Sequence, residues 1–255
     1  LEALLTKLGT STYQLCDIYY KSEKQLTFEK DAEKISNLIA IGNIDEAQKE
    51  LFHLKDRAKI NNQNLQCYLL LDASIKLYEG YNPQDILSIL YEAFAQTKPS
   101  FDFDDFRNVL LSVREANILN IIIVSFYRSD DILKAIRLGE ELMSSLKRQK
   151  SSLKEYQIIK INLAFNLAQC LEKEHRFKEA LSYIQMAEDL SIKSFEQALL
   201  PEIEFIKAKM YHLLNNDNEC IHIIQAIVPY MELIHKSDFA KIVRTYAEKE
   251  LHLCL

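Results

Sequence analysis

The sequence predicts an all-α protein in which helical hairpins stack into a right-handed superhelix, an α-solenoid. Three observations predict this fold class. Glycine and proline number only four each in 255 residues, well below their average usage of about 7% and 5%, and strand-and-turn proteins need far more of both. Apolar residues recur at helical spacing along the chain. A pair of amphipathic helices joined by a short polar turn also returns several times.

The clearest pair lies at Ile161–Ile192, where two amphipathic segments meet at a polar turn, Lys173–Arg176. Ala168 in the first segment and Ala180 in the second are small, so two antiparallel helices can approach closely there. This plan resembles the tetratricopeptide repeat, a helix-turn-helix unit of about 34 residues that stacks into a superhelix. The chain departs from that family at its first aromatic position, where it has Ala164.

Related pairs follow one another from Phe28 to the C-terminus. When the pairs are aligned on the small position of the first helix, they are 39 to 49 residues apart. The aligned residues are Ile35, Ser74, Ile123, Ala168, Ala208 and Ala247 in the first helices, and Ala47, Ile86, Ala135, Ala180 and Cys220 in the second helices. The widest spacing coincides with Lys98–Asp105, which we expect to be a long connection or a helix start rather than a domain boundary. Each pair buries its face only against neighbours, so we expect one array.

The chain begins with a segment that does not belong to the repeats. Leu1–Ser11 carries an apolar stripe that ends at Gly9, a helix C-terminal signal, and Tyr13–Lys21 predicts a linker helix. We therefore divide the chain into residues 1–22 and a repeat domain, residues 23–255. The last unit, Asp238–Leu255, has only a first helix. It either caps the stack or packs against a second subunit.

Composition and motifs exclude several classes of function. The net charge of −6 argues against DNA binding by these residues themselves, since gripping DNA requires clustered cations. No apolar run approaches the ~20 residues that span a bilayer. The five cysteines are scattered, which favours reduced thiols and a cytoplasmic protein. Phosphate-binding, metal-binding and nucleophile motifs do not occur, so we expect neither an enzyme nor a bound cofactor or metal.

The first helices of stacked pairs line the concave face, and the positions beside the packing stripe face the groove. These positions form our candidate ligand-binding site: Arg114, Asn117, Asn120, Asn162, Phe165, Asn166, Gln169, Phe205 and Lys209. Tyr127 falls at a similar position. Amide side chains both donate and accept hydrogen bonds, so they can hold the backbone of an extended peptide while the phenylalanines contact its side chains. Any one amide could equally be solvated or cap a turn; several at adjacent units favour a binding surface.

Taken together, the two parts of the chain resemble the sensor region of peptide-responsive transcriptional regulators of the Rgg/MutR and PlcR type. Leu1–Ser11 is similar to the closing helix of an Xre-type helix-turn-helix domain, and the degenerate repeats occupy the rest. The resemblance implies a homodimer whose N-terminal DNA-binding domain is controlled by a signalling peptide in the groove, as in quorum sensing. It also implies that groove asparagines and a basic residue hold the peptide. We transfer this role only to Asn117, Asn120, Asn162 and Asn166, with Arg114 as the basic residue.

Two alternatives remain at this stage. A cytosolic scaffold of tetratricopeptide type would use the same groove for a protein partner and would lack a DNA-binding domain. A regulator phosphatase shares the repeats but needs a catalytic amide or carboxylate on an N-terminal bundle, for which the segment before Phe28 leaves little room. The sequence leaves open the ligand, the operator, and whether regulation activates or represses.

Overall fold

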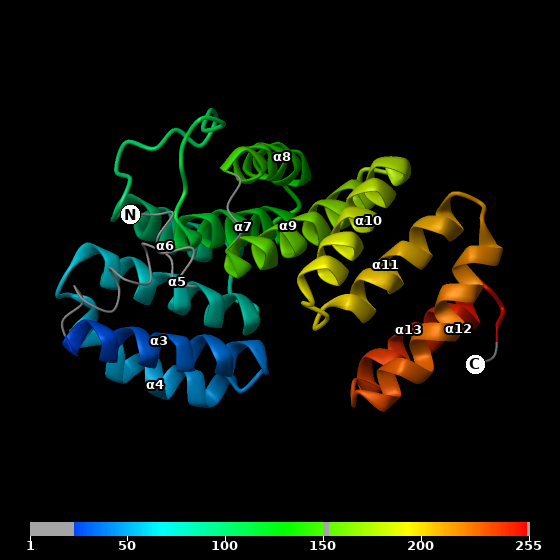
Figure 1. Ribbon diagram of the computed structural model, residues 1–255, viewed down its shortest axis with the longest axis horizontal. Helices are drawn as coiled ribbons and strands as arrows, with labels where there is room; N and C mark the ends of the chain where they lie inside the picture. The colour runs from blue at the N-terminus through cyan, green and yellow to red at the C-terminus, as the bar shows by residue number, and fades with distance from the viewer. Residues whose placement is uncertain (1–22, 150–152, 254–255) are drawn as a thin grey trace, which may run out of the picture. The chain divides into compact units, whose positions relative to one another are not determined.

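The computed structural model describes residues 23–149 and 153–253, and every regular element within these ranges is a helix (Figure 1). The helices are α3 (Glu23–Ala40), α4 (Ile44–Ala58), α5 (Asn62–Tyr78), α6 (Pro83–Ala95), α7 (Val113–Arg128), α8 (Ile132–Gln149), α9 (Lys154–Lys173), α10 (Phe177–Ser194), α11 (Leu200–Leu213), α12 (Asp217–Leu233) and α13 (Ser237–Glu250). The all-α prediction is confirmed. Residues 1–22, with the expected linker helix, lie outside the described ranges.

The chain divides into two compact units, one up to Ser100 and one from Phe101. The first unit contains the hairpins α3/α4 and α5/α6. The second contains α7/α8, α9/α10 and α11/α12, followed by α13. Within each unit the first helices of neighbouring hairpins touch: α3 contacts α5, and α9 contacts both α7 and α11. Contact between equivalent helices of successive repeats is the packing expected of an α-solenoid.

The boundary between the units lies in the connection from α6 to α7. The sequence predicts a long connection or a helix start here rather than a domain boundary, and the second half of that prediction is wrong: no helix in this described stretch links the two sides, and the contacts divide at Ser100. The segment is a connection, and α8 holds its second half. The backbone N–H groups of Phe106 and Arg107 donate to Glu141 Oε1 at 2.9 and 3.1 Å. The Ser145 hydroxyl donates to the carbonyl oxygen of Val109 at 3.1 Å. Side chains of α8 therefore replace the hydrogen bonds that a helix would have supplied.

The aligned small positions are the points of closest packing. All of them have 0% of their surface exposed except Ser74, which is partly exposed. The Ser74 hydroxyl donates to the carbonyl oxygen of Leu70 at 2.8 Å, so its own helix satisfies it. Gly139 marks a further close approach, because a Cβ atom there would lie 2.6 Å from Cδ2 of Leu167. The repeat alignment made from the sequence thus identifies where the helices meet.

In every hairpin, the first helix ends in the same kind of turn. Its turn residue has a positive φ, and this residue is Gly42, Gly80, Asp130, His175 or Asn215. In every case the N–H groups of that residue and the next one donate back to carbonyls of the last helical turn, which is the Schellman pattern. Only two of these residues are glycine. Glycine positions in the sequence therefore do not reveal that all five turns have the same conformation.

Helix α13 covers the end of the α11/α12 hairpin. Tyr246, Leu251 and Leu253 pack against a buried cluster that includes Met231 of α12 and Val243 of α13 itself. The sequence left open whether this last helix caps the stack or forms a dimer contact. In the structure it packs on the hairpin before it, and the dimer contact stays a prediction.

The cysteines of the described ranges lie in the interior of the hairpins. Cys67, Cys170 and Cys220 are buried, and burial raises the pKa of the Cys170 thiol to about 12. A thiol with such a pKa stays protonated and unreactive near neutral pH. In the same part of the chain, no cluster of histidine, cysteine and carboxylate side chains suits a metal ion, and no helix has the length and apolar character needed to cross a bilayer.

Candidate functional site

Four of the predicted site residues form one stripe along α9. Asn162, Phe165, Asn166 and Gln169 are spaced three or four residues apart, so they share one face of the helix. All four are partly exposed, whereas residues on the packing side, such as Leu167, are fully buried. We call this stripe, together with Arg114 and Asn117 of α7, the amide face.

The structure brings two predicted residues from different repeats into direct contact. Asn166 of α9 donates through Nδ2 to Oδ1 of Asn120 on α7, at 3.1 Å. Asn120 is 8% exposed, so it offers a ligand little surface. Its role in this geometry is to orient the Asn166 amide, which is itself partly exposed. Arg114 and Asn117 lie on the same helix as Asn120 and are also partly exposed.

One end of the amide face carries a fixed cation. Lys173, the last residue of α9, lies with Nζ 4.3 Å from the ring centroid of Tyr127 and 3.1 Å from Oδ1 of Asp130. Burial raises the pKa of Tyr127, so its ring stays neutral and can stack with the ammonium group. The sequence identified Tyr127 but not Lys173. From the sequence, Lys173 is expected only as the first residue of the polar turn Lys173–Arg176.

An ion pair to the next repeat lies at the same end of α9, beside Lys173. Lys209 of α11, a predicted site residue, pairs with Glu172 of α9. The next pair along joins Lys236 to Glu202 of α11, with Nζ and Oε1 2.7 Å apart. Lys209 is therefore engaged by a carboxylate of the neighbouring repeat. Glu172 is not among the predicted site residues, although it lies three residues beyond Gln169 on the predicted stripe.

Phe205 takes part in the core rather than in an open face, which corrects its expected role. Its ring packs edge to face against Phe239 and Tyr246 of α13, with centroids 5.7 and 5.4 Å apart, and the residue is 8% exposed. Phe165 stands at the equivalent position of α9, three residues before the aligned alanine, and remains partly exposed. The capping helix supplies the two aromatics that cover Phe205.

The amide face can act chemically as a surface for hydrogen bonding. Asn162 and Gln169 each carry a donor and an acceptor on one helix face, and Asn166 is oriented by its partner on α7. Phe165 adds an apolar ring in the middle of these amides. Such a mixture suits a ligand with alternating polar and apolar groups. It supplies no nucleophile and no general base.

Comparison with known proteins identifies the fold. No protein-family profile and no curated protein sequence matches the chain. The chain is similar in structure to Bacillus thuringiensis PlcR in complex with the peptide PapR7 and DNA, with a TM-score of 0.77 and 12% sequence identity over 94% of this chain and 81% of that one. The apo form of PlcR matches with a TM-score of 0.66 and 10% identity over 95% of this chain and 92% of that one.

Tetratricopeptide-like repeats of another origin match over a similar length. Those of a putative kinesin light chain of Podosopora anserina give a TM-score of 0.53 and 10% identity, over 83% of this chain and 98% of that one. At such identities the likeness establishes the fold, an α-solenoid of tetratricopeptide-like hairpins. The resemblance to the PlcR type that was drawn from the sequence is confirmed at the level of the fold.

Proposed function

We propose that this chain is the ligand-sensing region of a cytoplasmic transcriptional regulator and that it binds a short signalling peptide along the amide face. The observation that carries the proposal is the stripe of three amides and one phenylalanine on α9, with Asn166 held in place by Asn120 of the adjacent repeat. The same fold occurs in PlcR, which was solved with a peptide and DNA. Together these observations favour a peptide ligand.

The peptide backbone would be held by Asn162, Asn166 and Gln169, which can satisfy both N–H and C=O groups whatever the peptide sequence. Phe165 would contact one apolar side chain of the peptide, while Arg114 would hold an anionic group. Because Asn120 already orients Asn166, binding requires little further ordering of that side chain. A preorganised amide loses less conformational entropy when it binds.

Control of transcription would act through the packing of the first helices. In this proposal α7, α9 and α11 touch one another in series, and a peptide lying across α7 and α9 favours one spacing between them. Differential affinity for that spacing shifts the population of states. The shift reaches a DNA-binding domain on the N-terminal side, and a homodimer would present two such domains to its operator.

Isothermal titration of the whole chain with synthetic peptides, encoded by short open reading frames beside the gene, tests peptide binding. We expect Asn162→Ala and Gln169→Ala each to weaken binding about 5- to 10-fold, the loss of one neutral hydrogen bond worth about 1 kcal/mol. Gln225→Ala is the matched control, because Gln225 is an exposed amide on α12, a second helix. Unchanged affinity in both α9 variants would show that the amide face does not bind the peptide.

A second candidate function is a tetratricopeptide-type scaffold without DNA binding. The likeness to the kinesin light-chain repeats favours the scaffold, because tetratricopeptide-like repeats also occur in a protein that is not a PlcR-type regulator. The codons upstream of Leu1 distinguish the two candidates. A helix-turn-helix sequence there supports the regulator, and a start codon or an unrelated domain supports the scaffold.

A further inference from the structure

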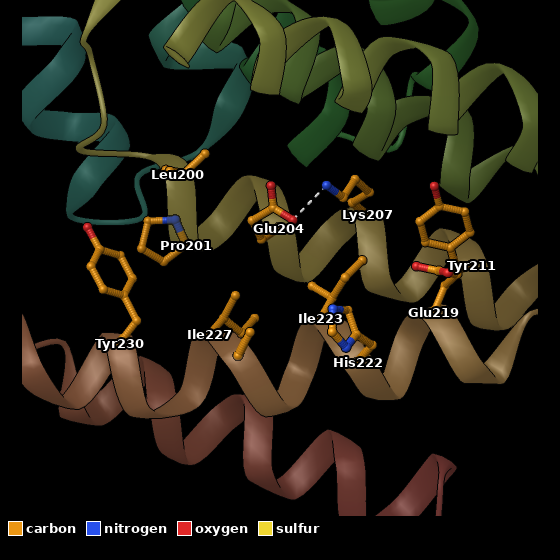
Figure 2. A pocket seen from close by; sticks show the side chains of 11 residues that line it. Leu200, Pro201, Glu204, Lys207, Tyr211, Glu219, His222, Ile223, Ile227 and Tyr230 are labelled. Atoms are coloured by element: carbon orange, nitrogen blue, oxygen red, sulfur yellow. Dashed lines mark ion pairs between the residues drawn. The ribbon is translucent and has the colours of Figure 1, made fainter.

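A pocket of about 470 Å³ lies between α11 and α12 (Figure 2). Its apolar walls come from both helices of the hairpin: Leu200, Pro201 and Tyr211 of α11, and Ile223, Ile227 and Tyr230 of α12. The two tyrosines mark its two ends, Tyr230 beside Pro201 and Tyr211 beside Glu219. Between them the α12 wall includes Ala226, whose small side chain leaves room for a ligand. The volume lies within the range of small-molecule sites, about 300 to 1,000 Å³.

Carboxylates outnumber cations around this pocket. Lys207 on its α11 wall has Nζ 2.8 Å from Glu188 of α10 and 2.8 Å from Glu204. Its side chain is only 12% exposed and that of Glu204 is 17% exposed. One ammonium group thus serves two carboxylates, and Glu219 adds a third acidic group at the pocket's end. The carboxylates around the pocket therefore outnumber its lysine.

The pKa of Glu204 is consistent with a carboxylate that still lacks full compensation. Burial raises this pKa, and the hydrogen bond from Lys207 opposes the rise. A second cation beside Glu204 would favour its ionised form further. The apolar walls would meanwhile cover the uncharged part of such a ligand, since apolar surface removed from water favours binding.

The pocket is distinct from the amide face. On α11, Leu200, Glu204, Lys207 and Tyr211 follow one another at intervals of three or four residues and so form one face. Lys209, which pairs with α9, lies two residues from Lys207 and Tyr211, on the opposite side of the helix at about 100° per residue. Both faces belong to the same helix. Ligands at the two places would not compete for the same atoms.

We propose that this pocket binds a small amphipathic cation, an apolar organic molecule with one amine or other positive group. The cation lies beside Glu204 and Glu219, and the apolar part lies against Ile223, Ala226 and Ile227. Tyr211, which lies beside Glu219, contacts the positive group through its ring face, an arrangement that favours cations over neutral molecules. Nothing in this assignment depends on the peptide site.

Fluorescence anisotropy with two dyes on the same xanthene skeleton tests the proposal: the apolar cation rhodamine 6G and the anion fluorescein. The intact chain is expected to bind rhodamine 6G at least about 10-fold more tightly than fluorescein, because electrostatic complementarity discriminates between them. Glu204→Gln keeps the side-chain shape, removes one charge and should weaken rhodamine binding about 10-fold. Ala226→Phe should weaken both dyes by filling the pocket. Glu248→Gln, an exposed carboxylate on α13, is the matched control and should leave both affinities unchanged.

Equal affinity for the two dyes overturns the assignment, as does rhodamine binding that is insensitive to both Glu204→Gln and Ala226→Phe. Far-UV circular dichroism of each variant establishes that it folds. If Glu204→Gln does not fold, Glu219→Gln replaces it, because Glu219 is exposed at the pocket's end. Asn162→Ala should bind rhodamine 6G like the unaltered chain. Failure of the peptide proposal would therefore leave this result unaffected.

Discussion

The hairpins α9/α10 and α11/α12 share one sequence plan but use the same repeat position differently. Phe165 and Phe205 each stand three residues before the aligned alanine of their helix. Phe165 is partly exposed on the amide face, whereas Phe205 is buried between α11 and α13. The difference lies in the helix that follows. Exposure of a groove position is decided by the next repeat as much as by the repeat that contains it.

The residues of the following helix explain the contrast. α13 places Phe239 and Tyr246 against Phe205, and the equivalent positions of α11 hold Leu200 and Lys207. Leu200 lines the pocket towards α12, and Lys207 pairs with carboxylates of α10 and α11. Two aromatic rings therefore cover Phe205. The corresponding residues of α11, Leu200 and Lys207, point away from Phe165 and contact α10 and the pocket beside α12.

The largest expected effect comes from removing the two phenylalanine rings in turn. Phe205→Ala should lower the free energy of unfolding by about 3 to 5 kcal/mol, the usual cost of a large buried aromatic. Phe165→Ala should lower it by about 1 kcal/mol, because part of that ring already faces water. Urea unfolding followed by circular dichroism measures both. Equal losses would contradict the contrast between the two hairpins.

A smaller effect is expected from the bond between Asn120 and Asn166. Asn120 occupies the same repeat position as the two phenylalanines, and its cover comes from an amide of α9. A double-mutant cycle with Asn120→Ala and Asn166→Ala should give a coupling energy of about 0.5 to 1.5 kcal/mol, the worth of one neutral hydrogen bond. The pair Asn120→Ala and Gln225→Ala is the control and should be additive, since Gln225 lies on α12.

Much of the fold could be predicted from the sequence because its determinants are local. Ala168 and Ala180 show the close approach of two helices, and Pro83 and Pro201 stand in the first turns of α6 and α11. The recurring left-handed turn could not be predicted, because residues such as His175 replace glycine there. His175 adopts a positive φ through backbone hydrogen bonds that depend on the whole turn.

The candidate site could be predicted only as far as one helix determines it. The stripe Asn162–Gln169 follows from helical periodicity, and the structure places it on one partly exposed face. Pairings between repeats depend on the register of neighbouring helices, which periodicity does not give. For this reason the burial of Phe205, the Asn120–Asn166 bond and the pocket beside Lys207 all required the structure.

The smallest expected effect concerns the ion pair between Lys209 of α11 and Glu172 of α9. Their side chains are 24% and 22% exposed, so water and salt screen the pair in part, and its contribution to stability should be about 0 to 1 kcal/mol. Lys209→Met should therefore shift the urea midpoint slightly at low salt and less at high salt, where screening weakens the pair. Lys249→Met, an exposed lysine at the end of α13, is the control for loss of charge alone. A large, salt-independent loss in Lys209→Met would contradict a weak, partly screened ion pair at this position.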